Sequence, residues 1–388
     1  MTKIIKNFPV VLHQLFFLFA QLLILYTYGI GYSGTLAYIG VVSAFLAVLI
    51  NLRWDIEIMV SNSQVIYKSI FDASLTIILM AGAILLFNII IGTLIPLYII
   101  LAAIFISIHE LLVSILFVQR KIYIYSFYRT LPALALILLA FIGFGPEIIW
   151  TVSFLFSALC LLIYFKSLLN QAFKEISLKR IQSINLRHKF NAAITASAFS
   201  FFSALFVIVI NHYYGDDYVG LWSNTIRIFN SLIIFLLGAC LPFILNMIRE
   251  KRSYSEKIKK FFYLWILLSP LIILSLFVVS NFGLYIFSFF EIFDLDVTNV
   301  ELSYIFIIGV LISFIGSSQG LYQSINKSIF LFCIIILAFF TGFLMIYDEV
   351  LTFNAILKIF IYLLSFLTIM ILVNLITYLI FKTNNLKS

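Results

Sequence analysis

Residues 95–143 read IPLYIILAAIFISIHELLVSILFVQRKIYIYSFYRTLPALALILLAFIG, two long apolar runs joined by the basic turn Gln119-Arg120-Lys121. Each run has the length of about 20 residues that an α-helix needs to cross the hydrocarbon core of a bilayer. Helices joined by so short a turn are antiparallel neighbours. The stretch therefore predicts a hairpin of two transmembrane helices.

The rest of the chain has the same character. Of its 388 residues, 64% are hydrophobic and 10% are charged, and the mean hydropathy is +1.18. A soluble domain has about 45–50% apolar and about 25% charged residues, so a water-exposed fold could not cover this apolar surface. A membrane β-barrel would need strands of about 10 alternating residues, a pattern that is absent. The composition excludes cytosolic, secreted and disordered classes and predicts an all-α polytopic membrane protein.

Apolar windows between turn signals predict about twelve transmembrane helices. A basic connection at residues 170–189 lies near the middle of the chain and divides them equally. Both halves begin and end on the same side, which predicts two parallel lobes, residues 1–169 and 190–388, around a central cavity. The expected helices lie near residues 9–27, 34–51, 69–91, 95–118, 122–143, 147–169, 190–211, 218–246, 261–288, 303–323, 329–347 and 354–381.

Positive charges mark the orientation of the helices. All of the 24 Lys and Arg residues except Arg129, Arg227 and Lys358 fall on one side of the predicted topology, and the opposite loops carry only acidic charges. Lys and Arg collect in cytoplasmic loops, so both termini of the multi-pass protein are expected in the cytoplasm. The net charge of +8 reflects this asymmetry and gives no argument for a nucleic-acid partner.

No arrangement of residues typical of catalysis is present. The chain lacks a phosphate-binding Walker A loop, a GxSxG nucleophile motif and an HExxH metal motif. The three cysteines lie inside apolar runs, and no His/Cys spacing suits a metal ion. We therefore expect a protein that is not an enzyme and that needs no cofactor or metal.

Arg227 is the most informative charge within a predicted helix. It lies about nine residues from the outside end, or about 13 Å, too deep to reach water by snorkelling. Gly220, Asn224, Ser231 and Gly238 share its helix face. Small residues also make tight helix interfaces, but charges inside a membrane usually face a cavity. We favour a cavity-lining, substrate-binding role for Arg227 and Asn224.

Glu110 and Arg129 lie at similar depths on either side of the turn at Arg120 and Lys121. Since the two helices are antiparallel neighbours, the two charges are expected to form an ion pair. A structural pair and a role in handling substrate or protons are equally open. If transport is coupled to protons or sodium, Glu110 is the candidate carrier.

Other polar residues give weaker signals. Lys358 is a further candidate for the cavity, although its position also permits snorkelling. Asp72 is expected to reach water or Arg53 at the cytoplasmic end. The four histidines lack metal-ligand spacing, and a lone histidine is more often simply hydrogen-bonded. Polar residues that share a helix face, and that predict a hydrophilic cavity between the lobes, are Gln14 with Gln21, Asn191 with Thr195, and Ser313 with Ser317, Gly320 and Ser324.

Two segments carry a family resemblance. Residues 52–63 read LRWDIEIMVSNS, where Arg53 and Ser63 match the pattern Leu-Arg-Tyr-Glu-x-Ala-Ile-x-Leu-Pro-x-Ser and Asp55 is a conservative replacement. Residues 218–223, YVGLWS, are similar to a "VG-x-Y" motif at the start of the eighth helix and include Gly220. These patterns resemble the Wzx-type polysaccharide flippases of the multidrug/oligosaccharidyl-lipid/polysaccharide exporter superfamily.

The resemblance implies that the protein moves an undecaprenyl-pyrophosphate-linked oligosaccharide from the cytoplasmic to the periplasmic leaflet by alternating access, for O-antigen or capsule synthesis. Membrane lipids and the polymerase and chain-length proteins of that pathway would be its partners. An exporter of another lipid-linked or small amphipathic substrate is the alternative. An O-antigen polymerase fits less well, because the longest outside loop, residues 290–302, is short and acidic.

The charge asymmetry predicts that a reporter fused after Lys382 lies in the cytoplasm. A phosphatase reporter, which is active only in the periplasm, should be inactive there, and a cytoplasm-active fluorescent reporter should give full signal. The inverse fusion, in the acidic outside loop at residues 290–302, serves as the control. Periplasmic activity after Lys382 would overturn the topology.

Overall fold

Every regular element that the computed structural model describes is an α-helix. Eight of these helices are long and apolar enough to cross a membrane, which confirms the all-α multi-pass membrane fold. The chain divides into two compact units, Met1–Val207 and Ile208–Ser388. The limits of the predicted lobes stay a prediction, because most of the linker lies outside the described residues. The structure describes residues 2–52, 54, 55, 58, 66–92, 95–119, 121–174, 200, 204–229, 254–288, 297–324 and 352–384.

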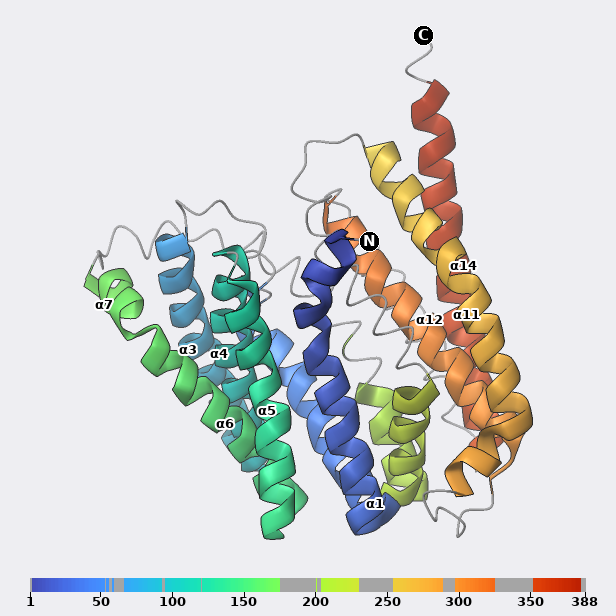
Figure 1. Ribbon diagram of the computed structural model, residues 1–388, viewed down its shortest axis with the longest axis horizontal. Helices are drawn as coiled ribbons and strands as arrows, with labels where there is room; N and C mark the ends of the chain where they lie inside the picture. Colours follow the sequence, from blue (N-terminus) through green and yellow to red (C-terminus); the bar gives the residue numbers. More distant parts are fainter. Residues whose placement is uncertain are drawn as a thin grey trace. The chain divides into compact units, whose positions relative to one another are not determined.

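The first unit is a bundle in which α1 packs against α4 and α5, and α4 and α5 both pack against α6 (Figure 1). The third to fifth predicted helices are confirmed. The sixth ends earlier than expected, at Tyr164, because the chain turns at Phe165 and continues as the short amphipathic α7. The helices are α1 (Thr2–Asn51), α3 (Ile66–Ile91), α4 (Leu97–Val118), α5 (Ile122–Ile142), α6 (Pro146–Tyr164) and α7 (Lys166–Lys174).

Helix α1 joins the first two predicted helices without the six-residue loop, residues 28–33, that the predicted ranges 9–27 and 34–51 leave between them. Its helical conformation is interrupted only at Gly29, which has φ 82° and ψ 179°. This region of backbone conformation is essentially restricted to glycine, so a single residue makes the turn that we assigned to six. The prediction of two helices is confirmed, and the prediction of the loop is wrong.

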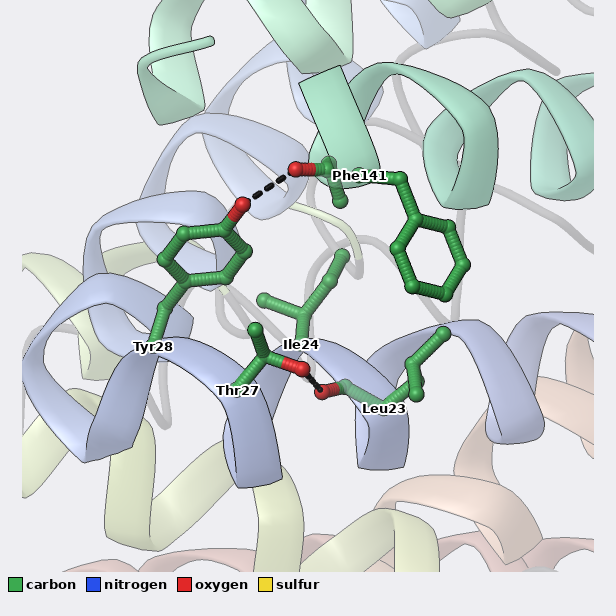
Figure 2. Close-up of a pocket in the computed structure, with 6 residues that line it drawn as sticks. Leu23, Ile24, Thr27, Tyr28 and Phe141 are labelled. Atoms are coloured by element: carbon green, nitrogen blue, oxygen red, sulfur yellow. Dashed lines mark hydrogen bonds between the residues drawn. The ribbon is translucent and has the colours of Figure 1, made fainter. Parts of the chain in front are cut away.

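Tyrosines that flank this turn join α1 to the end of α5. The Tyr28 hydroxyl donates a hydrogen bond to the carbonyl of Ala140 (Figure 2), and the Tyr32 hydroxyl donates one to the carbonyl of Phe144. The two tyrosine rings stack with their centroids 4.7 Å apart. Carbonyls at a helix C-terminus lack donors within the helix, and water is scarce inside a bilayer. The Ala140 carbonyl also accepts the Gly143 backbone N–H at 2.9 Å, so Tyr28 adds a second donor there, and the two tyrosines attach α1 to the end of α5.

The second arm of α1 packs closely against α6 because Gly40 has no side chain. A Cβ at Gly40 would lie 3.0 Å from the Trp150 ring. The indole N–H of Trp150 donates to the Ser43 hydroxyl at 3.0 Å. One turn of α1 thus provides both the space and the hydrogen-bond acceptor for this buried aromatic ring.

In the second unit, α12 packs against both α11 and α14 (Figure 1). Helix α12 begins with a capping box, in which the Glu301 carboxylate accepts a hydrogen bond from the Thr298 backbone N–H at 2.8 Å. The expected helix at 329–347 lies outside the described residues, and the expected helices at 190–211 and 218–246 are described in part. The boundary between the units falls inside the helix at residues 204–214. The other described helices are residues 216–229, α11 (Tyr254–Ser288), α12 (Asn299–Ser324) and α14 (Phe353–Asn384).

The conformation of Gly29 predicts a specific cost for any side chain at this position. A Cβ at Gly29 would meet no atom within 4 Å, so Gly29→Ala tests backbone strain alone and should destabilise the protein by about 1–3 kcal/mol. Gly82→Ala is the matched control, because Gly82 also has open space around it but lies inside α3. Thermal unfolding of purified protein should show a loss for Gly29→Ala and none for Gly82→Ala. Equal stability of the two variants would contradict the inference that a side chain at Gly29 strains the backbone.

Candidate functional site

The predicted ion pair between Glu110 and Arg129 is confirmed. Glu110 on α4 and Arg129 on α5 approach to 3.5 Å between a carboxylate oxygen and a guanidinium nitrogen. Their side chains are 29% and 21% exposed, so both are largely enclosed by the first unit. Their roles in substrate handling stay predictions.

Arg129 has two further partners. Its guanidinium donates hydrogen bonds to the Tyr125 hydroxyl at 2.8 Å and to Nε2 of His13 at 3.2 Å. The guanidinium carbon also lies 5.6 Å from the centre of the Tyr125 ring, within the range of a cation–π interaction. Helices α1, α4 and α5 therefore each provide a side chain that contacts the Arg129 guanidinium.

His109 extends the cluster on the side of Glu110. Its ring is buried, with Nε2 at 3.2 Å from the Tyr128 carbonyl and Nδ1 at 3.7 Å from a Glu110 carboxylate oxygen. We expected simple hydrogen bonding for the histidines and did not include His13 or His109 in the site. His109 adjoins Glu110 in sequence and could have been suspected, but no local pattern connects His13 with Arg129, which lies 116 positions away.

One residue of the family motif lies near this cluster. Asp55 is close enough to Arg129 to favour its positive charge, and Asp55 accepts a hydrogen bond from the Asn51 side chain at 3.3 Å. The other matching residues of that motif, Arg53 and Ser63, lie outside the described residues. The motif therefore adds one carboxylate to the surroundings of Arg129.

Asp72 is buried, with 6% exposure, so it does not reach water, and its alternative expected partner, Arg53, lies outside the described residues. It lies in α3, and its backbone carbonyl accepts a hydrogen bond from the Thr76 hydroxyl at 2.7 Å. The Thr76 hydroxyl in turn accepts a hydrogen bond from the Trp54 indole at 3.2 Å. Trp54 is itself buried, so these three residues lie in the interior of the first unit.

In the second unit, Arg227, Asn224 and Gly220 lie on the helix at residues 216–229. Arg227 is partly buried, and within the part of the chain that the structure describes it makes no hydrogen bond or ion pair. Asn224 is 1% exposed and donates to the Gly220 carbonyl at 2.8 Å. The side chains of Ser231 and Gly238, which complete the predicted stripe, lie outside the described residues.

Two other predicted polar positions differ in their surroundings, and the role of Lys358 in a cavity stays a prediction. Lys358 lies on the exposed side of α14 together with Tyr362, as expected for a snorkelling lysine. Ser317 on α12 accepts a hydrogen bond from the Trp265 indole of α11 at 3.2 Å. Ser317 therefore joins two helices.

A small apolar pocket lies beside the turn in α1, between α1 and α5. It is lined by Leu23, Ile24, Thr27, Tyr28, Ala140 and Phe141 (Figure 2). The Thr27 hydroxyl donates to the Leu23 carbonyl of its own helix at 2.8 Å, and the Tyr28 hydroxyl is engaged by Ala140. The pocket therefore presents carbon atoms, and its free space of about 10 Å³ is no larger than one water molecule needs, so it is not a substrate site.

No protein-family model and no curated protein matches this chain. Solved structures do match it. The MATE multidrug transporter DinF-BH, solved as a complex, is similar with a TM-score of 0.62 and 16% identity over 97% of this chain and 93% of that chain. Inward-facing and outward-facing structures of a multidrug resistance MATE family transporter of the MOP superfamily each have a TM-score of 0.57 and 14% identity over 97% of this chain, and cover 94% and 95% of those chains. The chain has the fold of the MATE transporters.

The geometry of the ion pair predicts how its variants behave. Glu110→Gln or Arg129→Gln leaves one charge without its counter-charge in a low-dielectric site, at a cost of about 3–5 kcal/mol, and should lower the amount of protein in the membrane. The double variant removes both charges and should recover abundance. Quantitative immunoblotting of membranes measures the effect. A double variant at two exposed, unrelated positions of the second unit, Asp217→Asn with Lys259→Gln, is the control.

Additive losses in the double variant would contradict an interaction between Glu110 and Arg129. A double variant that is abundant but inactive in transport would assign the pair to the transport cycle. An abundant and active double variant would make it a purely structural pair.

Proposed function

We propose that the protein is a membrane exporter that works by alternating access and is not an enzyme. The observation that carries this proposal is the similarity over nearly the whole chain to transporters that have been solved in both inward-facing and outward-facing conformations. A polar substrate loses several kcal/mol for each polar group that enters hydrocarbon without a partner. A protein whose polar side chains surround the substrate, and are open to one face of the membrane at a time, removes that barrier.

Two substrate classes fit such an exporter. The solved structures favour a small amphipathic molecule, because they are multidrug transporters. The resemblance of residues 52–63 and 218–223 favours an undecaprenyl-pyrophosphate-linked oligosaccharide. In that case the protein would work in a bacterial inner membrane beside a polymerase and a chain-length protein.

One feature supports an anionic substrate. Arg227 is partly buried in a predicted span and has no anionic partner within the described residues. An arginine in this setting is costly unless a counter-charge is near, and a phosphate or pyrophosphate accepts two parallel hydrogen bonds from a guanidinium. We therefore propose Arg227 as the group that binds the substrate's anionic head, with Asn224 as its neighbour on the same helix.

Reconstitution distinguishes the two substrate classes. Purified protein in lipid vesicles would be tested for transport of ethidium, a small fluorescent amphipathic cation, and separately for transfer of a fluorescent polyprenyl-pyrophosphate oligosaccharide between leaflets. Transport of ethidium alone supports the small-molecule exporter, and transfer of the lipid-linked sugar supports the flippase. Failure of both assays with folded protein would contradict export of either substrate class.

If the substrate is anionic, Arg227→Ala should abolish transport while leaving the protein in the membrane, because it removes the cation without stranding a charge. Arg227→Lys keeps the charge but loses the bidentate geometry and should retain part of the rate. Lys259→Ala, on an exposed position of α11, is the control and should match the wild type. Wild-type transport of the lipid-linked sugar by Arg227→Ala would make Arg227 a packing residue.

A further inference from the structure

The ring of His109 lies between two hydrogen-bond acceptors. Nε2 is 3.2 Å from the Tyr128 backbone carbonyl, which can only accept, so Nε2 carries a hydrogen atom. The Phe154 ring contacts the imidazole edge-on at 5.8 Å, and His109 is 1% exposed. The tautomer of a neutral His109 is therefore fixed by its surroundings.

In this tautomer Nδ1 carries no hydrogen atom, and its lone pair faces the Glu110 carboxylate. Nδ1 is 3.7 Å from a Glu110 oxygen, is buried, and has no hydrogen-bond partner among the described residues. Two acceptors that face each other without a hydrogen atom are unfavourable, and more so where water is excluded. A proton on Nδ1 would convert this contact into an ion pair, and a small approach of the two groups would add a hydrogen bond.

We propose that His109 and Glu110 form a binding site for one proton, which is held on Nδ1 of His109. The ring is then neutral in one state and an imidazolium paired with Glu110 in the other. This inference concerns the first unit alone and does not rest on the proposed substrate.

His13 does not fill this role in the arrangement observed. The Nε–H of Arg129 donates to Nε2 of His13 at 3.2 Å, and a guanidinium does not lose its protons in proteins. Nε2 of His13 must therefore accept, which makes His13 neutral while the contact exists. His109 is thus the histidine of this cluster whose ring nitrogen can gain a proton opposite a carboxylate.

Other titratable and charged groups determine what the proton does. Arg129 and Tyr125 on α5 face Glu110, His13 faces from α1, and Asp55 lies near Arg129. When His109 is an imidazolium, Glu110 is shared between two cations from α4 and α5. Binding of the proton thus weakens the electrostatic attraction between Glu110 and Arg129. A competing anion can then pair with the guanidinium more easily.

Nitrogen NMR of the full chain, labelled with ¹⁵N-histidine and purified in detergent, tests the site directly. The chain has only four histidines, so single His→Gln variants assign every ring. As the pH is lowered from about 8.5 to 5, Nδ1 of His109 should change from an unprotonated nitrogen to an N–H while Nε2 stays an N–H. In Glu110→Gln, the imidazolium signal of His109 should be lost from this range.

Glu110→Asp keeps the carboxylate and should keep the imidazolium, which guards against a folding defect in Glu110→Gln. His212→Gln, at an exposed position in the other unit, is the control and should leave the His109 titration unchanged. A His109 that stays neutral throughout in the wild type would overturn the proposal. So would a His109 that titrates identically in wild type and Glu110→Gln.

Discussion

The positive charge of Arg129 is the constraint on which the arrangement of the first unit depends. A guanidinium cannot be neutralised by losing a proton, so the surrounding helices must supply its partners. Glu110 does so from α4, Tyr125 from its own helix and His13 from α1. Each of these helices is highly apolar elsewhere, and their relative rotation is fixed by the need to turn these side chains inward.

The same scarcity of water governs the uncharged polar groups. Ser107 and Ser114 donate to backbone carbonyls four residues earlier on α4, and Ser107 also lies within hydrogen-bond distance of the Ala47 carbonyl on α1. Indole N–H groups reach across to hydroxyls of neighbouring helices, as Trp150 does with Ser43. Polar atoms inside the bundle are therefore satisfied largely by hydrogen bonds between near neighbours.

These local hydrogen bonds explain why the fold was more predictable than the site. Membrane helices have a strong signal in the sequence, because the bilayer sets their length and hydropathy. The Glu110–Arg129 ion pair could be predicted because a tight turn places the two residues at similar depths. Polar faces are ambiguous, since a serine that bonds its own helix has the same sequence pattern as one that lines a cavity. Contacts such as His13 with Arg129 have no sequence signal, because they depend on how distant helices meet.

The single-residue turn at Gly29 has a mechanical consequence. A long loop would give the two arms of α1 slack to slide independently, whereas one residue leaves none. Tyr28 and Tyr32 then attach this corner to the end of α5, whose other half carries Arg129. A displacement of either arm would therefore be transmitted to α5, so this corner couples the two arms of α1 to the helix that carries the buried cation Arg129.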